Sequence, residues 1–149
     1  MKTFLDAGVL IAAYRGQAEV GRRALEVLDD SARLFVSSDF VQLEVIPKAS
    51  YYKREDEVAF YEAFFAKAKR IHTCQSLFEE ALREATDHGL NAVDAPHIAA
   101  AKAEGCQEFF TTEDNTKPLS CERDRDPKPE LGSGQFDLAC ENCPARVAD

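Results

Sequence analysis

The chain has 149 residues, 45% of them hydrophobic, and a formal net charge of −9 at pH 7. These values predict one globular domain with its own core. No run approaches the ~18 apolar residues of a membrane span, and the N-terminus lacks a secretory pattern, so we expect a cytoplasmic protein without a membrane segment. A net negative charge argues against a general nucleic-acid binder. Five scattered cysteines indicate reduced thiols rather than a disulfide framework.

The first third of the chain alternates strand and helix patterns. A short apolar strand ends at Asp6, and Gly8 allows the chain to turn into a helix over residues 9–14. A longer helix is predicted over residues 17–30, followed by a second strand over residues 34–37. Ser38 is placed to cap a third helix that begins at Asp39.

This third helix carries Glu44 among apolar neighbours, where a lone carboxylate is costly unless it is paired or bound to a metal. The alternative is an ordinary exposed helix glutamate. Pro47 follows and removes a backbone hydrogen bond, so we expect the helix to kink or restart there. Basic and aromatic residues follow Pro47, and they could either contact RNA or pack over the junction between two helices. These residues are Lys48, Tyr51, Tyr52, Lys53 and Arg54.

The middle of the chain continues the same alternation. Residues 57–68 form an amphipathic helix, whose aromatic stripe we assign to the core rather than to a dimer surface. A third strand is predicted over residues 69–73 and a helix over residues 75–88, which ends at Gly89. The residues of this last helix expected to face inward are Leu77, Phe78, Ala81, Leu82 and Ala85.

Residues 90–115 place more acids at a helix start and a strand end. Asp94 opens an Ala-rich helix with Pro96 in its first turn, and a fourth strand is predicted over residues 108–112, followed by Glu113 and Asp114. In open α/β sheets, ligands bind outside the carboxyl ends of the strands. We therefore expect four carboxylates to converge at that edge of the sheet: Asp6, Glu44, Asp94 and Asp114.

Converging carboxylates repel one another, and the hard cations Mg²⁺ or Mn²⁺ resolve that repulsion. Such ions orient and activate water for attack on a phosphodiester. The strand and helix order predicts a three-layer α/β/α sandwich with a central parallel sheet of about four or five strands.

These motifs together resemble those of the PIN-domain nuclease family, and within it the VapC-type toxins. The segments that carry the resemblance are FLDAGVLIAA, SSDFVQLEVIPKA, VDAPHIAAA and FFTTED, within residues 1–120. The resemblance implies a metal-dependent endoribonuclease with Asp6, Glu44, Asp94 and Asp114 as metal ligands and catalytic acids. It also implies a small antitoxin partner, and we expect a homodimer.

Three neighbouring residues are candidates for supporting the acids. Thr112 fits the family's Thr-x-Asp pattern and is placed to orient a carboxylate or water, and Glu113 is the alternative to Asp114. His97 invites a reading as base or ligand, but the resemblance favours a structural role beside the site.

Residues 121–149 are rich in proline and charge, and we expect an extension that is loosely structured or packs on a partner. Cys140 and Cys143 have zinc-ligand spacing, and Cys121 adds a third thiolate, but a second close pair is missing.

Two other functional classes remain. One is a catalytically silent PIN-like interaction domain, against which the complete acid set argues. The other is a phosphatase or receiver domain, which also places an Asp after a strand. A phosphatase requires a second Asp where Gly8 stands, and Lys117 is poorly placed for a receiver.

Overall fold

The fold was obtained as a computed structural model that describes residues 1–16 and 18–112. In this part of the chain four strands form one sheet in the order β3-β2-β1-β4: β1 (Lys2–Leu5), β2 (Leu34–Ser38), β3 (Lys69–Ile71) and β4 (Glu108–Phe110). All three pairings are parallel. The predicted parallel α/β sheet is confirmed, although β3 and β4 are each two residues shorter than expected.

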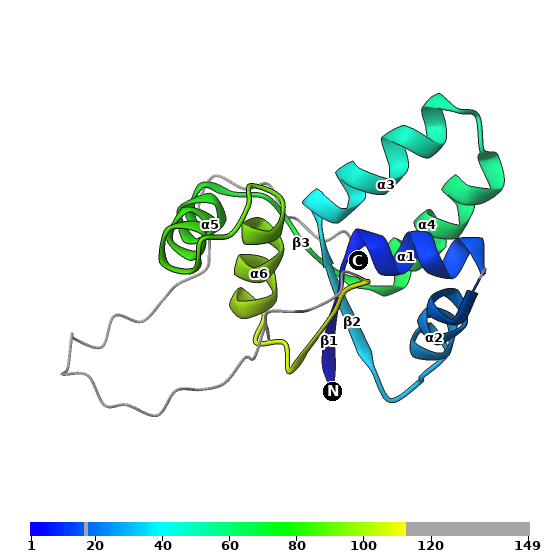
Figure 1. The fold of residues 1–149 in the computed structure, drawn as a ribbon, viewed down its shortest axis with the longest axis horizontal. Helices are drawn as coiled ribbons and strands as arrows, with labels where there is room; N and C mark the ends of the chain where they lie inside the picture. Colours follow the sequence, from blue (N-terminus) through cyan, green and yellow to red (C-terminus); the bar gives the residue numbers. More distant parts are fainter. Residues whose placement is uncertain (17, 113–149) are drawn as a thin grey trace, which may run out of the picture.

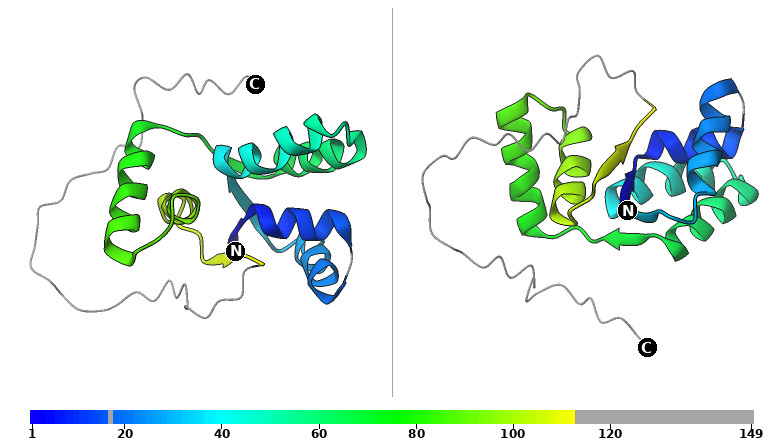
Figure 2. Two further views of the ribbon diagram at one scale, coloured as in Figure 1. Left: turned by 45° about the horizontal axis from the view of Figure 1, so that its top comes forward. Right: turned by 90° about the horizontal axis from the view of Figure 1, so that it is seen from below.

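Helices cover both faces of the sheet (Figure 1). On one side lie α1 (Ala7–Arg15), α2 (Ala18–Leu28), α3 (Asp39–Tyr51) and α4 (Glu55–Lys67). On the other side lie α5 (Gln75–His88) and α6 (Asp94–Ala103), as Figure 2 also shows. This is the three-layer arrangement that the sequence predicts. No helix in the described ranges is long and apolar enough to cross a membrane.

The central strand β1 is buried from both sides. Thr3, Phe4 and Leu5 have no exposed surface, because helices pack on each face of the sheet. On the α6 side the covering residues are alanines, and Ala99 and Ala100 are fully buried. Small side chains let α6 lie close to the sheet, and this closeness brings its first turn to the edge where the strands end.

Helix α5 turns a different face inward from the one predicted. Leu77 and Ala81 are buried as expected, but Phe78 and Leu82 are 55% and 53% exposed. Glu84 is buried instead, and its carboxylate accepts two hydrogen bonds from Lys102 of α6, at 2.6 and 2.8 Å. The prediction for Phe78 and Leu82 was wrong because an ion pair, rather than apolar contact alone, fixes how α5 meets α6.

Helix α3 continues through Pro47 to Tyr51, so the helix does not restart at the proline. Proline removes the hydrogen bond to the carbonyl of Leu43, four residues earlier. Leu43 is 67% exposed, so this carbonyl lies on a face of the helix that water can reach. The chain instead turns back at residues 52–54, and α3 and α4 form a helical hairpin that projects from the sheet (Figure 1).

Several predictions concern residues outside the described ranges. These are Glu113, Asp114, the extension over residues 121–149, and the cysteines Cys121, Cys140 and Cys143.

Glu104, the residue directly after α6, connects the end of this helix to strands β1 and β3. Its carboxylate accepts hydrogen bonds from Lys2 of β1 at 2.6 Å and from Lys69 of β3 at 2.7 Å. Burial opposes the charged form, but the two lysine hydrogen bonds outweigh burial, and the pKa of Glu104 is lowered. A carboxyl group with a lowered pKa stabilises the fold above its unfolded pKa, and this contribution is lost as the pH falls through the folded pKa.

We predict that Glu104→Gln lowers the free energy of unfolding by about 1 kcal/mol at pH 7, since both lysines lose their charged partner. The difference from wild type should shrink as the pH falls into the acidic range. Urea denaturation at several pH values measures it, with Glu80→Gln, in an exposed pair with Arg83, as control. A difference that stays constant down to acidic pH would contradict this account.

Candidate metal centre

The candidate site lies where the parallel strands end. Asp6 directly follows β1 and precedes the first residue of α1. Its backbone N–H donates to the carbonyl of Phe110 in β4 at 3.1 Å, which fixes the chain at this point. The Asp6 side chain makes no capping bond to α1, so the carboxylate is oriented by other groups.

Glu44 reaches the same place from α3. This helix begins where the sequence predicts, and the Ser38 hydroxyl accepts the backbone N–H of Val41 at 3.4 Å. Val41 and Val45 are buried and anchor the helix on the sheet. Between them the Glu44 side chain is 36% exposed and extends past the end of β1.

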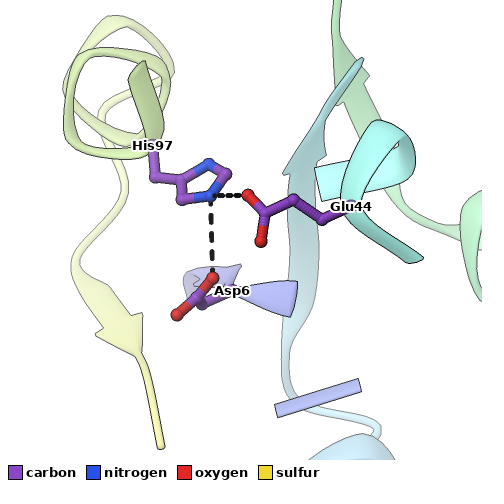
Figure 3. Close-up of side chains that lie close together, drawn as sticks. All are labelled: Asp6, Glu44 and His97. Carbon is purple, nitrogen blue, oxygen red and sulfur yellow. Dashed lines mark hydrogen bonds and ion pairs between the residues drawn. The ribbon is translucent and has the colours of Figure 1, made fainter. Parts of the chain in front are cut away.

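His97 joins the two acids from the opposite helical layer. Its Nε2 lies 2.7 Å from Glu44 Oε1 and 3.7 Å from Asp6 Oδ1 (Figure 3). The side chain is 2% exposed, and its Nδ1 has no hydrogen-bond partner among the described residues. A proton on Nδ1 would therefore be a buried, unpaired donor, so we assign the proton to Nε2, which donates to Glu44.

Asp6, Glu44 and His97 form a compact group in which the two carboxylates are placed to hold a divalent cation. The Nε2 of His97 and one oxygen of each carboxylate lie within 4.8 Å of one another. Two carboxylates suit Mg²⁺ or Mn²⁺, which prefer oxygen ligands. We call these three residues the acid–histidine cluster.

Asp94 lies outside this cluster in the described structure. It is the first residue of α6, as predicted, but its carboxylate accepts a hydrogen bond from the Asn91 side chain at 2.7 Å. Asn91 Oδ1 in turn accepts the backbone N–H of Asp94 at 2.9 Å. Of the three predicted acids within the described residues, the structure thus brings together two, with His97 one turn beyond Asp94.

Thr111, the residue before the predicted Thr112, orients Asp6. The Thr111 hydroxyl donates to Asp6 Oδ2 at 3.0 Å. Thr112 lies instead against Gly8, where a Cβ would come within 2.3 Å of the Thr112 hydroxyl oxygen. The family pattern indicated Thr112 but gave no signal for Thr111, because both threonines follow the end of β4 at Phe110.

The predicted basic and aromatic residues gather at the far end of the α3–α4 hairpin. All five are exposed: Lys48, Tyr51, Tyr52, Lys53 and Arg54. They lie on the same helix as Glu44 or in the turn that follows it.

The family model described as PIN domain matches residues 3–117 of this chain. No curated protein matches the sequence at a significant level.

Solved structures with the same fold come from bacterial toxin–antitoxin systems. A toxin–antitoxin complex from Klebsiella pneumoniae has 19% sequence identity and a TM-score of 0.63, covering 78% of this chain and 92% of its own. VapC20 from Mycobacterium tuberculosis, described as a sarcin–ricin loop cleaving toxin, has 18% identity and a TM-score of 0.62, covering 74% and 89%. VapBC2 from Rickettsia felis, bound to a promoter DNA fragment, has 18% identity and a TM-score of 0.58, covering 76% and 89%.

Thr111 and Thr112 offer a matched pair of substitutions. Thr111→Val keeps the shape of the side chain but removes the donor to Asp6, so the free energy of unfolding should fall by about 1.5 kcal/mol. Thr111→Ser keeps the hydroxyl and should stay within about 0.5 kcal/mol of wild type. Chemical denaturation without added metal measures both, with Thr112→Val as control. If Thr111→Val and Thr111→Ser were equally destabilised, the hydrogen bond to Asp6 would contribute nothing.

Proposed function

The chain belongs to the PIN domain family, and on this premise we propose that it is a metal-dependent endoribonuclease that acts as the toxin of a toxin–antitoxin pair. The observation that carries the proposal is the convergence of Asp6 and Glu44 with His97 at the carboxyl edge of the sheet. Solved structures with this fold include a toxin–antitoxin complex and a sarcin–ricin loop cleaving toxin, and they support the choice of branch.

The residues of the cluster have separate roles in this proposal. Asp6 and Glu44 hold Mg²⁺ or Mn²⁺, and His97 fixes Glu44 through its Nε2–H. A divalent cation bound there supplies positive charge for the scissile phosphate and activates the attacking water. Thr111 holds Asp6 Oδ2, which leaves Oδ1 directed toward the cluster.

Asp94 and a fourth acid complete the proposed site. Asp94 lies one turn before His97 on α6, and breaking its hydrogen bond with Asn91 frees its carboxylate to turn toward substrate or cation. We assign the fourth acid to Asp114, with Glu113 as the alternative.

We propose two protein partners. An antitoxin would insert an arginine among the acids, since a guanidinium pairs well with carboxylates. A second copy of the chain would associate through helices, and the exposed Phe78 and Leu82 on α5 are candidates for that contact.

The nuclease proposal predicts that the protein, freed of any antitoxin, cuts single-stranded RNA with Mg²⁺ or Mn²⁺ and stops when EDTA is added. Asp6→Asn should reduce the rate at least 100-fold, because the site loses a charged ligand. Cleavage of a labelled oligoribonucleotide measures both effects. Full activity of Asp6→Asn would assign the cleavage to another site or a contaminant.

The same assay separates the remaining alternatives. Asp114→Asn should reduce cleavage much more than Glu113→Gln, and the reverse order would exchange their roles. A well-folded wild-type protein that cuts no RNA with either metal would favour a catalytically silent interaction domain.

A further inference from the structure

The tip of the α3–α4 hairpin presents an exposed pair of aromatic rings. Tyr51 and Tyr52 are 80% and 57% exposed, and their rings meet edge to face at 5.1 Å. The Arg54 guanidinium lies 5.3 Å from the centre of the Tyr52 ring. Arg54 also pairs with Glu57 at 3.2 Å, so this contact helps to fix the position of the Tyr52 ring. The other two tyrosines of the chain, Tyr14 and Tyr61, instead pack on Phe60.

Two lysines beside this pair have no carboxylate partner among the described residues. Most lysine and arginine side chains in the described ranges form ion pairs with acids. Within those ranges four are without such a pair: Arg15, Lys48, Lys53 and Lys67. Two of the four, Lys48 and Lys53, flank the tyrosines. In a protein of net charge −9, this tip is therefore a place where exposed aromatic rings and uncompensated positive charge coincide.

The tip is also aligned with the acid–histidine cluster. Tyr51 follows Glu44 by seven residues, which places it about 10 Å further along α3 and only about 20° around the helix. Lys48 lies between them, about 40° from Glu44 around the helix. Glu44, Lys48 and Tyr51 thus share one exposed face of α3 that leads from the acids to the aromatic pair.

We propose that Tyr51 and Tyr52 form a base-stacking subsite for single-stranded RNA, with Lys48 and Lys53 against the phosphates. The inference rests on the proposed ribonuclease activity. It adds a second point of substrate contact, about 10 Å further along the axis of α3 than Glu44. Aromatic rings stack on unpaired bases of any sequence, whereas the faces of bases in a duplex are covered by the neighbouring bases. The subsite therefore selects loops and single-stranded segments.

A hollow of about 340 Å³ lies beside the tip, and its lining includes the acids Glu55 and Glu62 as well as Lys53 and Arg54. The two acids repel a phosphate backbone and direct it toward the α3 side, where Lys48 lies. Charge thus favours the same path that the helix geometry defines.

The test uses intrinsic fluorescence, because the chain has four tyrosines and no tryptophan. Binding of an oligouridylate is measured in the Asp6→Asn background, which keeps the RNA intact under the nuclease proposal. RNA should quench the tyrosine emission. Tyr51→Leu should weaken binding about tenfold, since stacking on one base is lost. Tyr51→Phe should keep the affinity and lose part of the quenching, because phenylalanine stacks but does not emit in this range.

Tyr14→Phe, away from the tip, is the matched control. It should leave the affinity unchanged, and the fraction quenched should rise slightly because one unquenched emitter is removed. Full RNA affinity in both Tyr51→Leu and Tyr52→Leu would overturn the subsite. It would indicate instead that the exposed rings contact a protein partner. That result would not affect the nuclease proposal if wild type still cuts RNA. If Asp6→Asn still degraded the probe, the nuclease proposal itself would fail.

Discussion

The hydrogen bond between His97 and Glu44 joins the two helical layers over the carboxyl edge of the sheet. His97 comes from α6 on one side and Glu44 from α3 on the other, and Asp6 at the end of β1 lies beneath them (Figure 3). Two carboxylates held this close repel each other, and each is stabilised by a donor from elsewhere: His97 for Glu44 and Thr111 for Asp6. The rest of the fold serves to keep these donors in place.

That arrangement depends on features that look purely structural. The buried alanines of α6 allow the helix to pack closely on the sheet, and this packing brings His97 within reach of Glu44. Gly8 leaves room for the chain after β4, which carries Thr111 to Asp6. Glu84 and Lys102 fix α5 on α6 and so hold the layer that carries His97.

Much of the fold was predictable because local signals and the global pattern agree. The start of α3 at the Ser38 cap and the end of α5 at Gly89, which adopts a left-handed conformation, both follow from the chemistry of caps and turns. The inward face of α5 was not predictable, since burial of Glu84 depends on a lysine 18 residues away.

The sequence predicted which edge of the sheet carries the site, but not every residue that forms it. The sequence placed Asp6 and Glu44 at that edge, but it ranked His97 below Asp94. In the structure His97 meets both acids, while Asp94 bonds to Asn91. The choice between adjacent residues, such as Thr111 and Thr112, depends on side-chain direction at one strand end, which composition and spacing do not determine.

The most direct test of the central claim is thermal unfolding with EDTA and with Mn²⁺. Binding at a hundredfold excess over the dissociation constant should stabilise wild type by about 2.7 kcal/mol, a melting shift of roughly 5–10 °C. Asp6→Asn and Glu44→Gln should lose most of that shift. Glu62→Gln, which removes the same charge from the exposed surface of α4, should keep it. Equal Mn²⁺ shifts in all four proteins would mean that Asp6 and Glu44 do not hold the cation.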